Sequence, residues 1–314
     1  MQEQVDKYLS KLIRHGLIDS DDAAGLYGLD DEIYTNRNAV DDSITELFRL
    51  LNINSLMVAR PETVRWELIT DLIEENPSLI CPCDCETLTF IHDIPVVETF
   101  DVHRVAHALN RRKGCIVADT GIITTGTVSL EQAFVSFSSI CFATFVKYFA
   151  DTLNGLFGYC DTPRPASSRI DSTLEKLSRT EPYAGPNPLS SETPDSEDSI
   201  ITAMDAAGKA IVAAGLVDSF FGNISFRKDD LIYISQTGSS LDELPGYIDC
   251  VPLDGSSTSD LTSSSELVAH VRTYGLTGDT AILHGHPRFS VIMSMFGPAL
   301  GFEETRFIED VPVV

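Results

Sequence analysis

The chain has few basic residues. Lysine and arginine together number 22 against 47 aspartates and glutamates, which gives a formal net charge of −25 over 314 residues. This excess of negative charge repels nucleic acid phosphates and anionic lipid headgroups, so we expect neither nucleic acid nor a membrane as a partner. A phosphorylated substrate remains compatible, because backbone N–H groups and a metal ion in a local pocket can outweigh the field of the whole chain.

Long apolar runs and an export signal are also missing. The longest apolar run, residues 134–146, is too short to span a bilayer and predicts a buried helix. The first 20 residues have the pattern of an amphipathic helix with charges throughout, unlike a signal peptide. Without an export signal, the seven unevenly spaced cysteines predict reduced thiols and a cytoplasmic protein.

A zinc-finger pattern is absent as well. Cys81, Cys83 and Cys85 alternate with other residues, and on a strand such residues share one face. No second Cys or His pair with zinc-finger spacing accompanies them. We therefore interpret these cysteines as one face of a strand rather than as a metal site.

The length allows two domains of ordinary size. Residues 161–198, rich in proline, serine and charge, predict a flexible linker between a domain at 1–160 and a second at 199–314. Four blocks recur in the same order on both sides, which indicates an internal repeat. The pairs are GLIDS (16–20) and GLVDS (215–219), DDEIYT (30–35) and DDLIYI (229–234), SLMVARP (55–61) and AILHGHP (281–287), and FIHDIPVV (90–97) and FIEDVPVV (307–314).

The two copies differ after the last block. In the first copy we expect a helix, a buried strand around residues 115–118, a glycine-marked turn and a long helix from about Leu130. The second copy has none of this, since its block ends at Val314. We therefore expect the second domain to lack its C-terminal strand and helices.

Three stretches of the second copy carry polar residues suited to chemistry. In FFGNISFR and the following IYISQTGSS, Gly222, Asn223, Thr237 and Gly238 have the composition of an anion cradle, although two ordinary turns are the better explanation when each stretch is taken singly. In TSSSE, the S-x-x-E spacing from Ser263 predicts a capping box, and the helix start that it marks can also bind a phosphate.

The third stretch is AILHGHP, which we expect to be a buried strand. His284 and His286 are two residues apart and so lie on one face. Buried imidazoles need partners for their ring nitrogens, and two neighbouring imidazoles form half of a zinc site. Metal binding and packing both remain open for this pair.

Taken together, the order G-N-I-S, T-G, S-S-E with His270 four residues on, and H-x-H-P resembles the class II aldolase/adducin family. The resemblance covers about residues 199–314 and, more weakly, 1–155. It implies two copies of a three-layer α/β/α fold around a largely antiparallel sheet, assembled as a homo-oligomer. It also implies a zinc ion or another divalent metal and a small phosphorylated sugar or aldehyde as substrate.

The resemblance also assigns roles to residues. It makes His284 and His286 two of three zinc ligands, makes Glu266 the catalytic acid and base, and leaves His270 outside the metal site. The expected phosphate pocket comprises Gly222, Asn223, Thr237, Gly238, Ser264 and Ser265. The implied activity is metal-dependent aldol cleavage or condensation. A non-enzymatic adducin-like assembly module, or an epimerase or dehydratase acting on a sugar phosphate, is the alternative.

Two departures from the family pattern bear on activity. The third zinc histidine would fall beyond Val314, so we expect a longer chain or a complementing C-terminal fragment to supply it. The first copy has Thr120 at that position, Val58 and Arg60 in place of the two histidines, and residues 23–24 (Ala-Ala) in place of Gly-Asn. We therefore expect the first domain to be a degenerate copy, kept for assembly or stability.

Overall fold

The computed structural model describes residues 1–159, 167–178, 193–217, 220–254, 256, 262–296, 306–308 and 311–313. They form two compact units, which we call unit 1 (Met1–Thr180 with Val291–Gly297) and unit 2 (Glu181–Ser290 with Pro298–Val314). Part of the expected linker, residues 167–178, forms a helix, whereas 161–166 and 179–192 lie outside the described residues.

Unit 1 is a mixed α/β structure built around one sheet. Its helices are α1 (Gln2–Arg14), the short 3-10 helix η1 (Asp21–Ala23), α2 (Asp42–Leu50), α3 (Thr63–Glu75), α4 (Cys85–Ile91), α5 (Val102–Leu109), α6 (Leu130–Leu156) and α7 (Ser167–Ser178). Its strands are β1 (Ala24–Leu29), β2 (Ile33–Thr35), β3 (Ser55–Ala59), β4 (Leu79–Ile80), β5 (Ile94–Val97), β6 (Gly114–Val117) and β7 (Gly121–Gly126).

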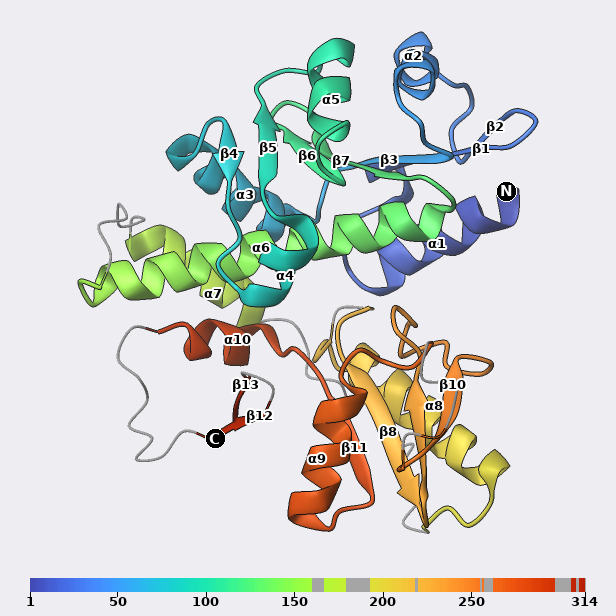
Figure 1. Cartoon of the computed structure of the whole chain (residues 1–314). Helices are drawn as coiled ribbons and strands as arrows, with labels where there is room; N and C mark the ends of the chain where they lie inside the picture. Colours follow the sequence, from blue (N-terminus) through green and yellow to red (C-terminus); the bar gives the residue numbers. More distant parts are fainter. Residues whose placement is uncertain are drawn as a thin grey trace. The chain divides into compact units, whose positions relative to one another are not determined.

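The sheet of unit 1 runs in the order β2-β1-β3-β7-β6-β5-β4, and only β5 and β6 pair in parallel. Helices α2 and α5 cover one face, where Ile44, Leu47 and Val105 pack against strand residues, and α1 and α6 lie on the other side (Figure 1). The predicted α/β fold with a largely antiparallel central sheet is therefore confirmed.

Helix α6 begins at Leu130, where the sequence predicts a long helix. By length and composition it could cross a membrane, but 89% of its most apolar window is buried inside the protein. It packs along β3 and β7 and against α3. Its apolar surface is therefore used as the core of unit 1.

Unit 2 is a smaller α/β structure. Its elements are α8 (Glu197–Ala213), β8 (Asn223–Lys228), β9 (Leu231–Ser235), β10 (Ile248–Pro252), α9 (Leu267–Thr277), β11 (Ala281–His284) and α10 (Arg288–Ser294), the last shared with unit 1; β12 (Arg306–Ile308) and β13 (Val311–Val313) pair with each other. The sheet order is β10-β9-β8-β11, all antiparallel. Tyr274 of α9 packs on one face against Ile232 and Ile234, and α8 lies on the other face (Figure 1).

The two sheets share a three-strand arrangement. In unit 1, β3 pairs with β1 and β1 with β2; in unit 2, β11 pairs with β8 and β8 with β9, again all antiparallel. The β1–β2 loop has three residues (30–32), whereas the β8–β9 loop has two (229–230). This one-residue difference shifts the sequence alignment of β1 relative to β8 by one position.

Two expectations about local structure were wrong. β11 is not buried, because among the described residues it is the edge strand of its sheet, and Leu283 is 45% exposed. The three cysteines at 81, 83 and 85 do not share a strand face, because β4 ends at Ile80 and α4 begins at Cys85. In both cases the neighbouring elements decide the outcome rather than the local residue pattern.

Candidate functional site

The end of β11 is held close to the start of β8 by a glycine. Gly222 precedes β8 with φ +93, a conformation that side chains rarely adopt. A Cβ atom there would lie 2.4 Å from the carbonyl oxygen of His284. Only glycine therefore allows the backbone at 222 to approach the residue that the sequence singles out as a metal ligand.

A hydrogen-bonded trio of side chains lies at this junction. His284 and Asn223 are direct partners in the β8–β11 ladder, so both side chains are on the same face of the sheet. Glu266 precedes α9 and reaches both: its Oε2 lies 2.6 Å from His284 Nδ1 and accepts a hydrogen bond of 2.7 Å from Asn223 Nδ2. Three elements distant in sequence thus meet at one carboxylate.

The Glu266 side chain does not form the capping box that the sequence pattern predicts. The S-x-x-E spacing favours a capping box from Ser263, but Glu266 is itself the N-cap of α9 and its side chain makes no capping bond. Burial alone would raise the pKa of Glu266, but hydrogen bonds from His284 and Asn223 lower it to about 2. Glu266 is therefore ionised at neutral pH.

His286 lies beside this trio. Its ring centroid is 4.7 Å from that of His284 and 5.9 Å from that of Phe221. The two imidazoles are close enough for one divalent cation to bind both. Asn223 is 5% exposed, and its Oδ1 has no hydrogen-bond partner among the described residues. The site therefore holds an unused acceptor next to the two imidazoles.

Four of the six predicted phosphate-binding residues, Thr237, Gly238, Ser264 and Ser265, lie in a second cluster next to Glu266, whereas Gly222 and Asn223 lie at the His284 junction. Thr237 Oγ1 donates to the Ser263 carbonyl at 2.9 Å and accepts from the Ser265 N–H at 3.0 Å. The Thr237 hydroxyl therefore ties the segment before α9 to the end of β9. Gly238, with φ +73, is exposed, and its N–H has no partner among the described residues.

The two serines of this cluster differ in their surroundings. Ser264 is buried, and its Oγ accepts a hydrogen bond from the Glu266 N–H at 3.3 Å. Ser265 is exposed, and no partner of its hydroxyl lies among the residues the structure describes. A phosphate at this cluster would find the Gly238 N–H and the two serine hydroxyls as donors.

A buried aspartate that the sequence did not single out positions this segment. Asp249 on β10 is 9% exposed. Its carboxylate accepts hydrogen bonds from Gln236 at 2.7 Å, Thr262 at 2.6 Å and Ser263 at 3.1 Å. Nothing in the local sequence marks this role, because the three donors come from two distant segments.

His270 lies on the core side of the site. It is 3% exposed, and its Nδ1 is 2.7 Å from Ser225 Oγ, which is also 2.6 Å from the Tyr274 hydroxyl. Burial lowers the pKa of His270 to about 4, so the ring is neutral at pH 7. In this arrangement His270 packs and hydrogen-bonds within the core beneath the site.

The site supplies some, but not all, of the ligands that a divalent metal ion needs. Two imidazoles are typical zinc ligands, and the hydrogen bond that His284 Nδ1 donates to the Glu266 carboxylate resembles the carboxylate contacts that orient metal-bound histidines. Within the described ranges, no group of three or more His, Cys, Asp or Glu side chains is arranged to hold a metal ion. A complete site therefore needs a further ligand.

The same positions of unit 1 carry different side chains. Val58 pairs with Gly25 as His284 pairs with Asn223, so Gly25, and not the expected Ala24, is the counterpart of the asparagine. The correction follows from the longer β1–β2 loop. The first copy still lacks a counterpart of the Asn223 amide, since glycine, like alanine, has no amide side chain.

The counterpart of His286 makes structural contacts. The Arg60 guanidinium lies 4.9 Å from the Trp66 ring and donates to the Asp119 carbonyl at 3.4 Å. Asp119 and Thr120 form the turn between β6 and β7, so this turn lies beside the end of β3. A Cβ added at Gly121 would lie 2.5 Å from the Ala59 carbonyl oxygen, which shows how closely the two segments approach.

A polar cluster of two imidazoles, a carboxylate and an amide at a sheet end, beside serine hydroxyls, defines unit 2 as an α/β domain with a candidate metal- and anion-binding site. Residues 202–314 match the family described as class II aldolase and adducin N-terminal domain. This part of the chain, about a third of its length, is therefore similar to the class II aldolase and adducin family. No curated protein gave a significant match.

Two matches among solved structures have low sequence identity and TM-scores below 0.5. L-fuculose-1-phosphate aldolase from Thermus thermophilus is 15% identical, with a TM-score of 0.40, and the match covers 52% of this chain and 98% of that chain. YgbL from Escherichia coli, named as a putative aldolase/epimerase/decarboxylase, is 13% identical with a TM-score of 0.37, over 55% and 96% of the two chains.

Proposed function

We propose that unit 2 carries the active site of a metal-dependent aldolase, which cleaves or forms a carbon–carbon bond next to the carbonyl of a small sugar phosphate. The observation that carries this proposal is the meeting of His284, His286, Glu266 and Asn223 at the end of β11. The family match of residues 202–314 supports it.

His284 and His286 would hold the divalent metal, for which zinc suits the imidazole donors. When bound, the metal would act as a Lewis acid that stabilises the enediolate charge left by carbon–carbon cleavage. The contact between Glu266 and His284 Nδ1 leaves Nε2 as the metal-binding nitrogen of that ring. Neutral imidazoles suit this role, since they add no charge to the metal site.

Glu266 would transfer the proton. Its pKa of about 2 keeps it ionised, so it can accept a proton from a substrate hydroxyl. Asn223 fixes the carboxylate through Nδ2, which leaves the buried Oδ1 to accept a hydrogen bond from a second substrate hydroxyl. In this geometry the asparagine orients the sugar and the acid rather than the phosphate.

The phosphate would bind at the cluster formed by Gly238, Ser264 and Ser265. This cluster is adjacent to Glu266 in the chain and offers a backbone N–H and two hydroxyls. Binding energy from this remote group would hold the reacting carbons in place. The substrate is therefore a short phosphorylated sugar or aldehyde.

Unit 1 is, in this proposal, a degenerate copy of the same domain. Its β1, β2 and β3 repeat the pairing of β8, β9 and β11, while Val58, Arg60 and Thr120 replace the metal ligands. The β6–β7 turn of unit 1 lies beside the end of β3. We propose that a ligand equivalent in position to Thr120 completes the metal site of unit 2.

Metal binding tests the site directly. Titration of the metal-free full chain with zinc should give one site per chain in calorimetry. His284→Ala and His286→Ala should each weaken it by more than about 100-fold, beyond the loss typical of outer-shell partners. His103→Ala, an exposed histidine of unit 1, is the matched control and should bind zinc like the unchanged protein. A protein that binds no metal would instead favour the adducin-like assembly module.

Activity then tests the reaction class. A panel of ketose and aldose phosphates should include one that releases an aldehyde, and Glu266→Gln should lower that rate about 1,000-fold, as loss of a general acid or base does. The glutamine keeps the size and loses the charge, so zinc binding should largely persist. An epimerised or dehydrated product without aldehyde release would assign the site to the alternative chemistry.

A further inference from the structure

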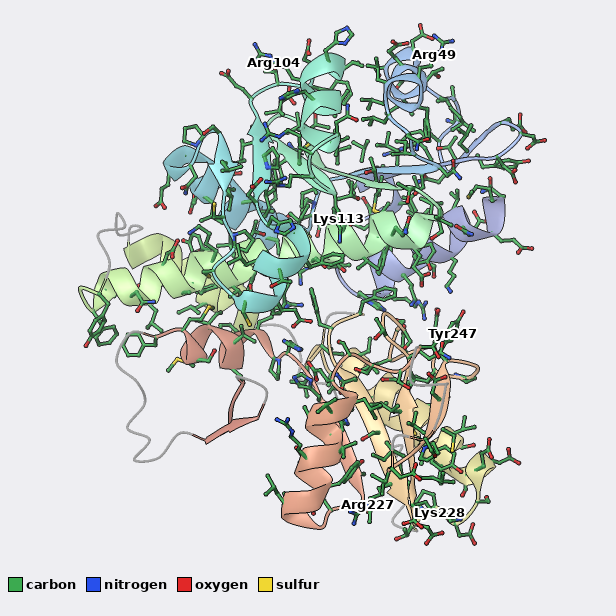
Figure 2. The ribbon with its side chains drawn as sticks, viewed as in Figure 1. Arg49, Arg104, Lys113, Arg227, Lys228 and Tyr247 are labelled. Atoms are coloured by element: carbon green, nitrogen blue, oxygen red, sulfur yellow. The ribbon has the colours of Figure 1, made fainter. Side chains whose placement is uncertain are left out.

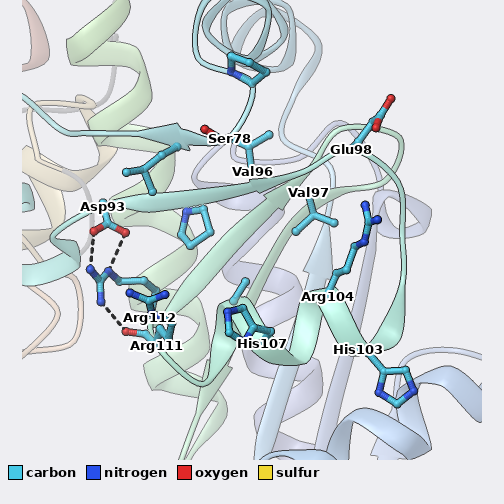
Figure 3. Close-up of a pocket in the computed structure, with 14 residues that line it drawn as sticks. Ser78, Asp93, Val96, Val97, Glu98, His103, Arg104, His107, Arg111 and Arg112 are labelled. Atoms are coloured by element: carbon cyan, nitrogen blue, oxygen red, sulfur yellow. Dashed lines mark hydrogen bonds and ion pairs between the residues drawn. The ribbon is translucent and has the colours of Figure 1, made fainter.

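Unit 1 contains a cavity of about 750 Å³ whose lining includes none of the positions that match the unit 2 site. Its walls come from the segment before β4, the strand β5 and the helix α5 with the turn after it (Figure 3). A volume of this size suits a small organic ligand. All of the lining residues belong to unit 1.

The lining is basic in a strongly acidic chain. Four of the 22 lysines and arginines lie within residues 104–113, and three of these, Arg104, Arg111 and Arg112, line the cavity. Two exposed histidines, His103 and His107, line it as well. Positive charge is therefore concentrated where the rest of the chain is negative.

The arginines differ in how their charge is used. Arg112 forms an ion pair with Asp93 and so cancels one of the two carboxylates of the lining. Arg104 and Arg111 have no carboxylate partner for their guanidinium groups among the residues the structure describes. The remaining carboxylate, Glu98, is exposed and also makes no ion pair within the described part of the chain.

The cationic groups lie on both sides of an apolar centre. Figure 3 places Arg111 and Arg112 with Asp93 at one end of the cavity and Arg104 with Glu98 at the other. Arg104 lies in the first half of α5, whereas Arg111 follows the end of this helix at Leu109. Val96, Val97 and Ala108 line the region between them.

We propose that this cavity binds a small organic anion, which carries a phosphate or carboxylate group on an apolar body. The planar guanidinium group of Arg104 or of Arg111 matches this anionic group with paired hydrogen bonds, the other arginine attracts it at longer range, and the valines and Ala108 contact the body. The ion pair of Arg112 with Asp93 keeps a carboxylate from repelling the ligand. The site is separate from the proposed unit 2 site and does not depend on it.

Calorimetric titration with four probes tests the proposal. Phenyl phosphate and benzoate carry both an anionic group and an apolar body, inorganic phosphate carries only the anion, and benzyl alcohol only the body. At least one of the first two should bind about tenfold more tightly than either incomplete probe. Equal binding of inorganic phosphate would exclude the apolar contact, and equal binding of benzyl alcohol would exclude the anion contact.

Variants locate the binding. Arg104→Gln and Arg111→Gln should each weaken binding about tenfold, while Glu98→Gln should tighten it a few-fold by removing a like charge. Arg49→Gln is the matched control, because Arg49 is an exposed arginine of unit 1 on α2, away from the cavity (Figure 2).

Two further measurements, of the affinity of His284→Ala and of the thermal unfolding of each variant, complete the test. His284→Ala should leave the affinity unchanged, since it alters only the unit 2 site. All of the substituted arginines are exposed, so thermal unfolding should show the same transition in each variant. The proposal is overturned if neither organic anion binds, or if binding survives unchanged in both Arg104→Gln and Arg111→Gln.

Discussion

The same three strands occur in both units with different chemistry at their ends. β3, β1 and β2 of unit 1 pair as β11, β8 and β9 do in unit 2. Val58 in unit 1 and His284 in unit 2 face equivalent partners, yet Val58 packs against an apolar core and His284 contacts a carboxylate. Strand pairing uses backbone groups, so this arrangement persists when the site residues change.

The two units also differ in which elements cover the matching strands, β3 in unit 1 and β11 in unit 2. β3 has β1 on one side and β7 on the other, with α6 against it. β11 is paired only with β8 within the described residues. Met57 is therefore fully buried at 0% exposure, whereas its counterpart Leu283 is 45% exposed. A site at the end of β11 rests on a less supported strand than its counterpart in unit 1.

The largest effect on stability is expected at Gly222, a position where unit 2 needs glycine and unit 1 does not. Gly222→Ala should lower the stability of unit 2 by at least about 3 kcal/mol, because it adds backbone strain to a 2.4 Å clash with the His284 carbonyl. Hydrogen exchange of the β8 and β11 amides measures it. The unit 1 counterpart, Ala24, already carries a Cβ atom.

A second glycine, Gly278, allows the cost of backbone strain to be measured without the cost of a steric clash. Gly278 also has a positive φ of +74, but a Cβ atom there meets nothing within 4 Å. Gly278→Ala should therefore cost only about 1 kcal/mol. Equal losses for the two variants would mean that the close approach to His284 contributes nothing.

The next prediction compares the loss of stability when Met57 on β3 and its counterpart Leu283 on β11 are each replaced by alanine. Met57→Ala should destabilise unit 1 by about 3 kcal/mol, since it leaves a cavity in a packed core. The chain's only tryptophan, Trp66, lies on α3 of unit 1, so its fluorescence in a urea titration follows this unit. Leu283→Ala should change unit 2 by less than about 1 kcal/mol by hydrogen exchange.

The outcome of this pair also reports on the proposed third ligand. If a further segment covers β11 in the functional protein, Leu283→Ala will cost as much as Met57→Ala. A small cost would instead mean that β11 stays an edge strand in solution. The comparison of the two variants therefore measures how far unit 2 resembles the complete sheet of unit 1.

Much of this arrangement follows from local patterns in the sequence. The long helix from Leu130 follows from its continuous apolar residues, and the closeness of His284 and His286 follows from their alternation at a strand end. The blocks at 30–35 and 55–61 also identified strands that pair in the same way in both units, whereas the block at 90–97 contains β5 in unit 1 and its match in unit 2 contains β13 and part of β12. These features depend on residues near in sequence.

The remainder depends on contacts between distant segments. The exposure of β11 is set by which strand pairs beside it, and the position of Gly25 opposite Val58 by the length of a loop. Glu266 fits a capping motif, but its side chain binds His284 instead. The role of Asp249 likewise depends on donors from other segments. No local pattern specifies which competing partner a polar side chain takes.

The last contrast concerns acid stability, which should differ between the units. His270 is buried with a pKa of about 4, because desolvation outweighs the attraction of Glu266, while His284 lowers it further. Between pH 6.5 and 4 the unfolded chain binds a proton at this position and the folded chain does not, so stability falls as the pH falls. At pH 5 the loss should be about 2 kcal/mol.

Unit 1 supplies the internal control for this prediction. Its described histidines, His15, His92, His103 and His107, are exposed or only partly buried, unlike His270. Acid unfolding should therefore begin in unit 2 while Trp66 fluorescence stays constant. His270→Asn keeps a hydrogen-bonding group for Ser225 and cannot take up the proton, so unit 2 should lose less stability on acidification. If the variant and the unchanged protein show the same pH profile, protonation of His270 does not limit the stability of this domain.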